Sequence, residues 1–71
     1  MAFSEKVKYV RSKLLLSQED LASKIGVSFA TVNRWEKGVE PQFLTKARFE
    51  KFCEEHGIKF EEASDVWTRK V

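Results

Sequence analysis

The sequence has little cysteine, proline, glycine or histidine, and each shortage excludes a class of structure. A single cysteine, Cys53, rules out an internal disulfide, and with the single His56 it cannot complete a tetrahedral zinc site. The longest aliphatic run, 14–16, is far shorter than a membrane span, and the first residues lack the apolar stretch of a signal peptide. A lone thiol is typical of reducing compartments. We therefore expect a cytoplasmic protein with no metal, no cofactor and no membrane contact.

A large excess of charge of one sign is also absent. The 71 residues carry 13 basic and 11 acidic side chains, a formal net charge of +2. These charges are unevenly placed, because residues 1–53 hold ten basic and six acidic groups whereas residues 54–71 hold three basic and five acidic groups. A mildly basic body with an acidic tail is compatible with a polyanion on one side and a second subunit or another protein on the other.

The few glycines and the one proline divide the chain into segments of helical length. Apolar residues recur at steps of three or four from Ser4 to about Leu15, and Ser4 is the predicted N-cap of that first helix. No segment alternates with period two, so we expect an all-α fold of four to five short helices in one domain, 1–71. The further helices are predicted at about 18–25, 28–37 and 43–56, with a fifth over 61–69; the core spans 4–57, and 58–71 form a tail.

Each predicted helix has an apolar face. A small alanine suits a close helix crossing, and a valine between two helices anchors their turn in the core. Cys53 is predicted to act as a small buried hydrophobe. The expected apolar positions are Val7, Val10, Leu14, Leu21, Ala22, Ile25, Val27, Val32, Trp35, Leu44, Ala47, Phe49, Phe52 and Cys53.

The most informative segment is a pair of short capped helices in the middle of the chain. Ser17 followed by Asp20 predicts a capping box at the start of the first of them. Gly26 predicts the end of that helix in a left-handed conformation, and Ser28 predicts the N-cap of the next. A three-residue turn that begins with glycine, between two short helices, is typical of a helix-turn-helix.

This pattern resembles the phage repressor and Cro type of helix-turn-helix, the xenobiotic-response-element family of bacterial regulators. The resemblance runs from about Val7 to Ile58 and implies a lambda repressor-like bundle whose recognition helix, about 28–37, lies in the major groove of DNA. It rests on Arg11, Leu16-Ser17-Gln18, Leu21-Ala22, Ile25-Gly26-Val27-Ser28, Thr31-Val32 and Trp35-Glu36-Lys37-Gly38.

The resemblance also implies contact residues. Base contacts fall on Phe29, Ala30, Asn33 and Arg34, and Gln18 at a helix start meets a backbone phosphate. Phe29 and Ala30 depart from the polar residues frequent in the family, because neither can hydrogen-bond a base edge, and Phe29 is equally a candidate for protein contact. Further phosphate contacts are expected from Ser28, Thr31, Lys37, Lys46 and Arg48, for which an ordinary solvated surface is the alternative.

Glu36 and a partner on another helix are predicted to have a structural role. Glu36 places a negative charge at the end of the recognition helix, where the helix dipole disfavours it. A residue placed against local preference often has a tertiary partner, and the family resemblance implies that this partner is Arg11. We expect an ion pair shorter than about 4 Å that ties the first helix to the third.

These observations favour a sequence-specific DNA-binding transcriptional regulator that acts on double-stranded DNA as a homodimer. The dimer contact is expected in the tail, through Phe60, Val66 or Trp67. The alternatives are a DNA-targeting or antitoxin-like module of a larger system, with a protein partner, and a helical protein-interaction domain. We do not expect an enzyme, because a chain this small can hardly enclose a catalytic cleft.

Overall fold

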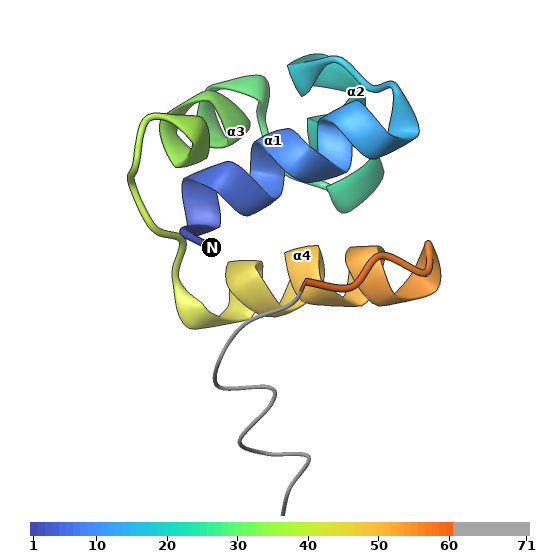
Figure 1. Cartoon of the computed structure of the whole chain (residues 1–71). Coiled ribbons are helices and arrows are strands. Elements are labelled where there is room, and N and C mark those ends of the chain that lie inside the picture. The colour runs from blue at the N-terminus through green and yellow to red at the C-terminus, as the bar shows by residue number, and fades with distance from the viewer. Residues whose placement is uncertain (61–71) are drawn as a thin grey trace, which may run out of the picture.

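Four helices form the part of the chain that the structure describes. The computed structural model describes residues 1–60, and over these residues it contains no strand. Figure 1 shows α1 in the middle of the molecule, with α2 and α3 above it and α4 below. The all-α prediction is confirmed, whereas the predicted fifth helix, 61–69, lies outside the described residues. The helices are α1 (Phe3–Leu14), α2 (Gln18–Ile25), α3 (Phe29–Glu36) and α4 (Phe43–Glu55).

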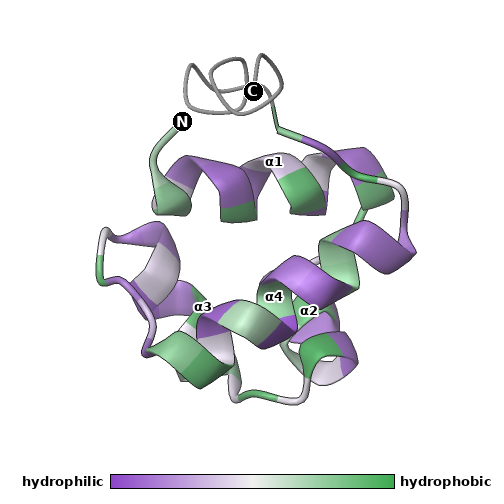
Figure 2. Ribbon diagram, turned by 90° about the horizontal axis from the view of Figure 1, so that it is seen from below, coloured by the Kyte–Doolittle hydropathy of each residue, from purple (hydrophilic) through white to green (hydrophobic). Residues whose placement is uncertain are grey.

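The helices enclose one apolar core, to which each contributes one face. α3 packs against both α1 and α2, and α2 also touches α4. Green and purple bands alternate along the helices in Figure 2, as amphipathic helices require. The core residues are Phe3, Val7, Val10, Leu21, Ala22, Ile25, Val32, Trp35, Phe49, Phe52, Cys53 and Ile58, with Leu14, Leu16, Val27 and Phe60 packed against them.

An aromatic cluster joins three of the helices. The Phe3 ring from α1 meets Trp35 of α3 and Phe49 of α4 edge to face, with ring centroids 5.4 and 5.1 Å apart. Trp35 and Phe49 also meet, at 6.1 Å. This geometry is the one that aromatic pairs prefer. The prediction for Trp35 is therefore confirmed, and Phe3 is a core residue that the sequence analysis did not identify.

The helix ends follow the predicted signals at α2 and α3 but not at α1. The Ser17 hydroxyl accepts from the Asp20 amide at 3.0 Å, and Asp20 accepts from the Ser17 amide in return. The Ser28 hydroxyl caps α3 by accepting from the Thr31 amide at 3.2 Å. The prediction of Ser4 as an N-cap is wrong. The N-cap is Ala2, two residues earlier, where the Glu5 carboxylate accepts from the Ala2 amide at 3.0 Å.

Two further expectations are corrected at α4 and beyond it. Leu44 and Ala47 are exposed, because the buried face of α4 is confined to Phe49, Phe52 and Cys53. The core does not end at residue 57 either, because Ile58 is buried. Ile58, which follows α4, thus belongs to the core.

Candidate nucleic-acid interface

The turn between α2 and α3 sets the geometry of the candidate site. Gly26 ends α2 with a φ of 92°, a left-handed conformation that favours glycine. Its amide and that of Val27 both donate to the Ala22 carbonyl, at 2.8 and 2.9 Å. Val27 is half-buried against the core. The turn therefore holds α3 in a fixed position across the end of α2, as a helix-turn-helix requires.

α3 has one face in the core and the other toward solvent. Val32 and Trp35 are buried and hold the helix to the rest of the molecule. Ala30 and Arg34 are exposed, and Phe29 is exposed over 49% of its surface. Four of the eight residues of α3 are the predicted base contacts, and only Asn33 among them is half-buried. This face of α3 is accessible to a large partner.

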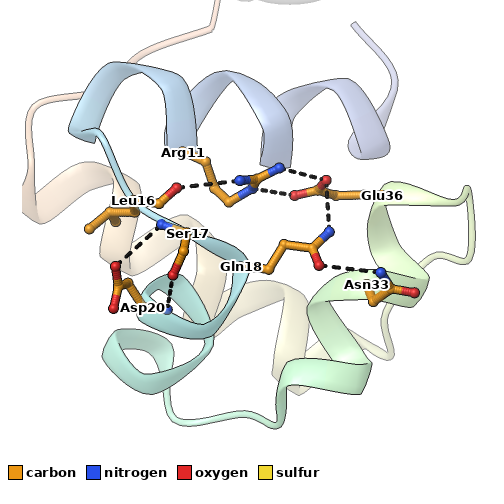
Figure 3. A network of polar contacts seen from close by, with 7 residues as sticks. All are labelled: Arg11, Leu16, Ser17, Gln18, Asp20, Asn33 and Glu36. Carbon is orange, nitrogen blue, oxygen red and sulfur yellow. Dashed lines mark hydrogen bonds and ion pairs between the residues drawn. The ribbon is translucent and has the colours of Figure 1, made fainter.

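Arg11 and Glu36 form an ion pair between α1 and α3. The Arg11 Nε and Nη2 atoms donate to the two carboxylate oxygens of Glu36, at 2.6 and 2.9 Å, in a bidentate arrangement (Figure 3). The Arg11 Nη1 atom also donates to the Leu16 carbonyl at 3.3 Å. The Glu36 side chain is only 8% exposed and that of Arg11 27%. The pair thus ties α1 to the end of α3, as the family resemblance implied.

The protonation of the pair follows from its surroundings. Burial is the strongest single influence on Glu36 and opposes its charged form, but hydrogen bonds from Arg11 and Gln18 together with nearby positive charges outweigh it, so the pKa of Glu36 is lowered. The hydrogen bond to Glu36 raises the pKa of Arg11. Both side chains are therefore charged at neutral pH.

Gln18 continues this network from α2 to the exposed face of α3. Its Nε2 atom donates to Glu36 Oε1 at 3.0 Å, and its Oε1 atom accepts from Asn33 Nδ2 at 3.2 Å. Figure 3 shows the four side chains as one continuous series of contacts. From the sequence, Gln18 and Asn33 were expected to make separate contacts with DNA, and the bond between them was not predicted. No spacing rule signals it, because it depends on how α2 and α3 cross.

The candidate phosphate-contacting residues come from three places: Ser28 and Thr31 at the start of α3, Lys37 at its end, and Lys46 and Arg48 on α4. Lys37 and Arg48 are exposed and Lys46 is half-buried. The Arg48 guanidinium lies beside the turn, 3.8 Å from the position that a Cβ on Gly26 would occupy. Thr31 is half-buried and shares a 2.8 Å hydrogen bond with the exposed Ser28 hydroxyl.

Phe60, one of three residues expected to contact a second subunit, packs within its own chain. Its ring meets that of Tyr9 with centroids 5.7 Å apart, and the Lys6 ammonium lies 5.2 Å from its centre. Val66 and Trp67 lie outside the described residues. Phe60 therefore joins the tail to α1, and its internal packing reduces the surface that it offers to a partner.

Residues 1–60 lack two features, a membrane-spanning helix and a cluster of metal-ligating side chains. None of the helices there has the length and apolar character needed to cross a membrane. Within the same residues, no three His, Cys, Asp or Glu side chains gather closely enough to hold a metal ion.

Comparison with known proteins identifies the family to which the chain belongs. A helix-turn-helix family model matches residues 7–62, well over half of the chain. No curated protein and no solved structure matches the chain significantly. The family consists of DNA-binding regulatory domains and not of enzymes. The matched residues include both helices of the turn described above, and the chain therefore belongs to the Cro/C1-type helix-turn-helix family of DNA-binding transcription regulators.

Proposed function

We propose that the protein is a sequence-specific DNA-binding regulator that places α3 in the major groove. The exposed face of α3 supports this proposal most directly. It carries a guanidinium, an amide, an aromatic ring and a methyl group on a helix whose opposite face is buried. The major groove admits one α-helix, and a helix anchored on one side presents the other to base edges.

The side chains on that face define the expected readout. Arg34 can donate two hydrogen bonds to guanine or bind a phosphate, and Asn33 can pair with adenine. Phe29 and Ala30 have no polar side-chain atoms, so they recognise a thymine methyl group by apolar contact. This set gives two directional contacts and two weaker ones for each copy of the domain.

Phosphate contacts position α3 on the duplex. Lys37, Lys46 and Arg48 supply the charge, and Ser28 and Thr31 supply hydroxyl groups at the start of α3. Gln18 keeps one N–H of its Nε2 atom for a phosphate, because its other N–H is bonded to Glu36. Such contacts give affinity without sequence information.

We propose that two copies bind together to a palindromic site. One α3 covers only about half of a typical operator, and a homodimer places its two recognition helices roughly 34 Å apart along the DNA. Sedimentation of the free protein, and the spacing of the half-sites recovered by selection, test this assignment. A monomer bound to single, unpaired half-sites contradicts it.

Fluorescence anisotropy with duplexes selected from random sequence tests DNA binding itself. With three cations on phosphates, the logarithm of the binding constant is expected to fall with the logarithm of salt concentration with a slope of about −3 per domain. Lys46→Ala is expected to weaken all sequences alike and reduce the slope by about 1. Arg34→Ala is expected to relax base preference, and Lys59→Ala, outside the proposed contacts, serves as the control. No binding at low salt contradicts the proposal.

A protein-interaction role is the second candidate, and exposed apolar side chains favour it. Phe43 and Leu44 at the start of α4 are 82% and 75% exposed, and Phe29 is half-exposed. A module that delivers a partner protein to DNA uses such residues in the partner contact. Under this alternative, Phe29→Ala abolishes co-purification of the partner whereas Arg34→Ala leaves it unchanged.

A further inference from the structure

We propose that Gln18 is a positioning residue, which with Glu36 fixes the orientation of the Asn33 amide so that Asn33 accepts adenine and rejects guanine. The proposal rests on the proposed function, because it concerns the base that α3 reads. It goes beyond that function by assigning base selectivity to two side chains that do not themselves meet the base.

The orientation of the Gln18 amide is determined by Glu36. Its carboxylate can only accept hydrogen bonds, and Arg11 holds it in the charged form through two of them. Gln18 therefore must turn its NH2 group, and not its oxygen, toward Glu36. The 3.0 Å contact from Gln18 Nε2 to Glu36 Oε1 has this polarity.

The same polarity passes to Asn33. With its nitrogen committed to Glu36, Gln18 turns its Oε1 atom toward α3, where only a donor can face it. Asn33 supplies that donor through Nδ2 at 3.2 Å. A reversed Asn33 amide would bring two carbonyl oxygens together. Figure 3 accordingly shows the Asn33 oxygen turned away from Gln18.

The free edge of Asn33 then has a defined hydrogen-bonding pattern. Its Oδ1 atom forms no hydrogen bond with any of residues 1–60 and remains an acceptor, and one N–H of Nδ2 remains a donor. Adenine offers N6–H and N7 in the major groove, a donor and an acceptor that match this edge. Guanine offers two acceptors, O6 and N7, and its O6 atom would face the Asn33 oxygen.

Without Gln18 the selection weakens. A free asparagine amide can rotate by half a turn and present its NH2 group to guanine O6 or N7, which makes one hydrogen bond and removes the repulsion. The two hydrogen bonds that link Glu36, Gln18 and Asn33, which we call the relay, exclude this second orientation. Loss of the relay should therefore improve binding to guanine relative to adenine at one position of the site.

The test uses Gln18→Met, which keeps the length of the side chain and removes both hydrogen bonds. Asn33→Ala first identifies the base pair that Asn33 reads, as the position whose preference it removes. At that position the wild-type protein is expected to prefer adenine over guanine by roughly tenfold or more. Gln18→Met should reduce this ratio several-fold, whereas Lys46→Ala should weaken both duplexes and leave the ratio unchanged.

A double variant separates positioning from general damage. In the Asn33→Ala background, Gln18→Met should have no further effect on the adenine-to-guanine ratio, because the group through which it acts is absent. An unchanged ratio in Gln18→Met, or an equal effect with and without Asn33, overturns the proposal. Circular dichroism of each variant verifies that the fold is retained.

The relay and the proposed function fail in distinguishable ways. Salt-dependent DNA binding with no adenine preference at the Asn33 position overturns the relay alone. Absence of DNA binding overturns both. In the free protein, nuclear Overhauser contacts are expected between the Asn33 NH2 protons and the Gln18 side chain, and their absence overturns the relay whatever the DNA result.

Discussion

At the scale of single residues, the Arg11–Glu36 ion pair is the polar contact that we expect to contribute most to stability. Glu36→Gln leaves a half-buried guanidinium facing a neutral amide, and we expect it to lower the free energy of unfolding by about 2 kcal/mol. Urea denaturation measures this loss. A double-mutant cycle with Arg11→Met should show strong coupling, and additive losses would contradict a direct interaction.

The same pair predicts a pH dependence. Because the pKa of Glu36 is lowered in the folded protein from an ordinary value of 4.5, the unfolded chain takes up its proton first as the pH falls. The stabilisation by Glu36 is therefore present at neutral pH and is lost progressively below about pH 4.5, as the pH falls through the folded pKa. Denaturation midpoints of the wild type and Glu36→Gln should converge in acid, and parallel curves would refute this assignment.

The reactivity of the Cys53 thiol can also be predicted. Burial, assisted by the negative charge of Glu50, raises its pKa from 9.0 to about 11. The folded protein then holds about 100-fold less thiolate than an exposed cysteine at the same pH, and the thiolate is the reactive form. We expect a thiol reagent at pH 8 to label Cys53 at least about 100-fold more slowly in the folded protein than in urea. Equal rates would place the thiol at the surface.

At the scale of the helices, the end of α1 differs from the other three. Leu15 ends it with a φ of 57°, whereas Gly26, Gly38 and Gly57 hold the positive φ angles after α2, α3 and α4. The Leu15 side chain is 90% exposed, so it gains little from packing. A left-handed leucine is strained by about 1 kcal/mol.

Leu15→Gly should therefore stabilise the protein. Relief of the strain exceeds the added chain entropy of glycine in the unfolded state, for a net gain of about 0.5 kcal/mol. Leu15→Ala keeps the strained φ and serves as the matched control. Thermal denaturation followed by circular dichroism compares them, and a lower midpoint for glycine than for alanine would contradict the explanation.

The helices could be predicted from the sequence where local chemistry determines them. Ser17, Gly26 and Ser28 bond within a few residues of themselves, so their caps follow from spacing alone. Contacts across the fold could not be predicted in this way. The Gln18–Asn33 bond depends on a helix crossing, and the burial of Ile58 depends on the chain turning back after α4. The Arg11–Glu36 pair was accessible only through resemblance to a family.

At the scale of the whole molecule, the aromatic cluster connects helices that are far apart in the sequence. Phe49→Ala removes a ring that meets both Phe3 and Trp35, and we expect a loss of about 3–5 kcal/mol. Small domains often have little more than about 5 kcal/mol of stability. Phe43→Ala, on the exposed start of the same helix, should change stability by less than about 0.5 kcal/mol. Equal losses from the two variants would show that the cluster is not the centre of the core.

The link between α2 and α3 has a consequence for engineering new specificities. Exchange of recognition helices between relatives assumes that residues 29–36 determine base preference independently of the rest of the chain. In this protein, a transplanted segment 29–36 would not include Gln18, whose oxygen accepts a hydrogen bond from residue 33. A transplanted helix with an aspartate there would set two acceptors against each other. Under the proposed role of Gln18, the transferable unit is the helix together with residue 18, and libraries that vary both should yield more functional binders than libraries that vary the helix alone.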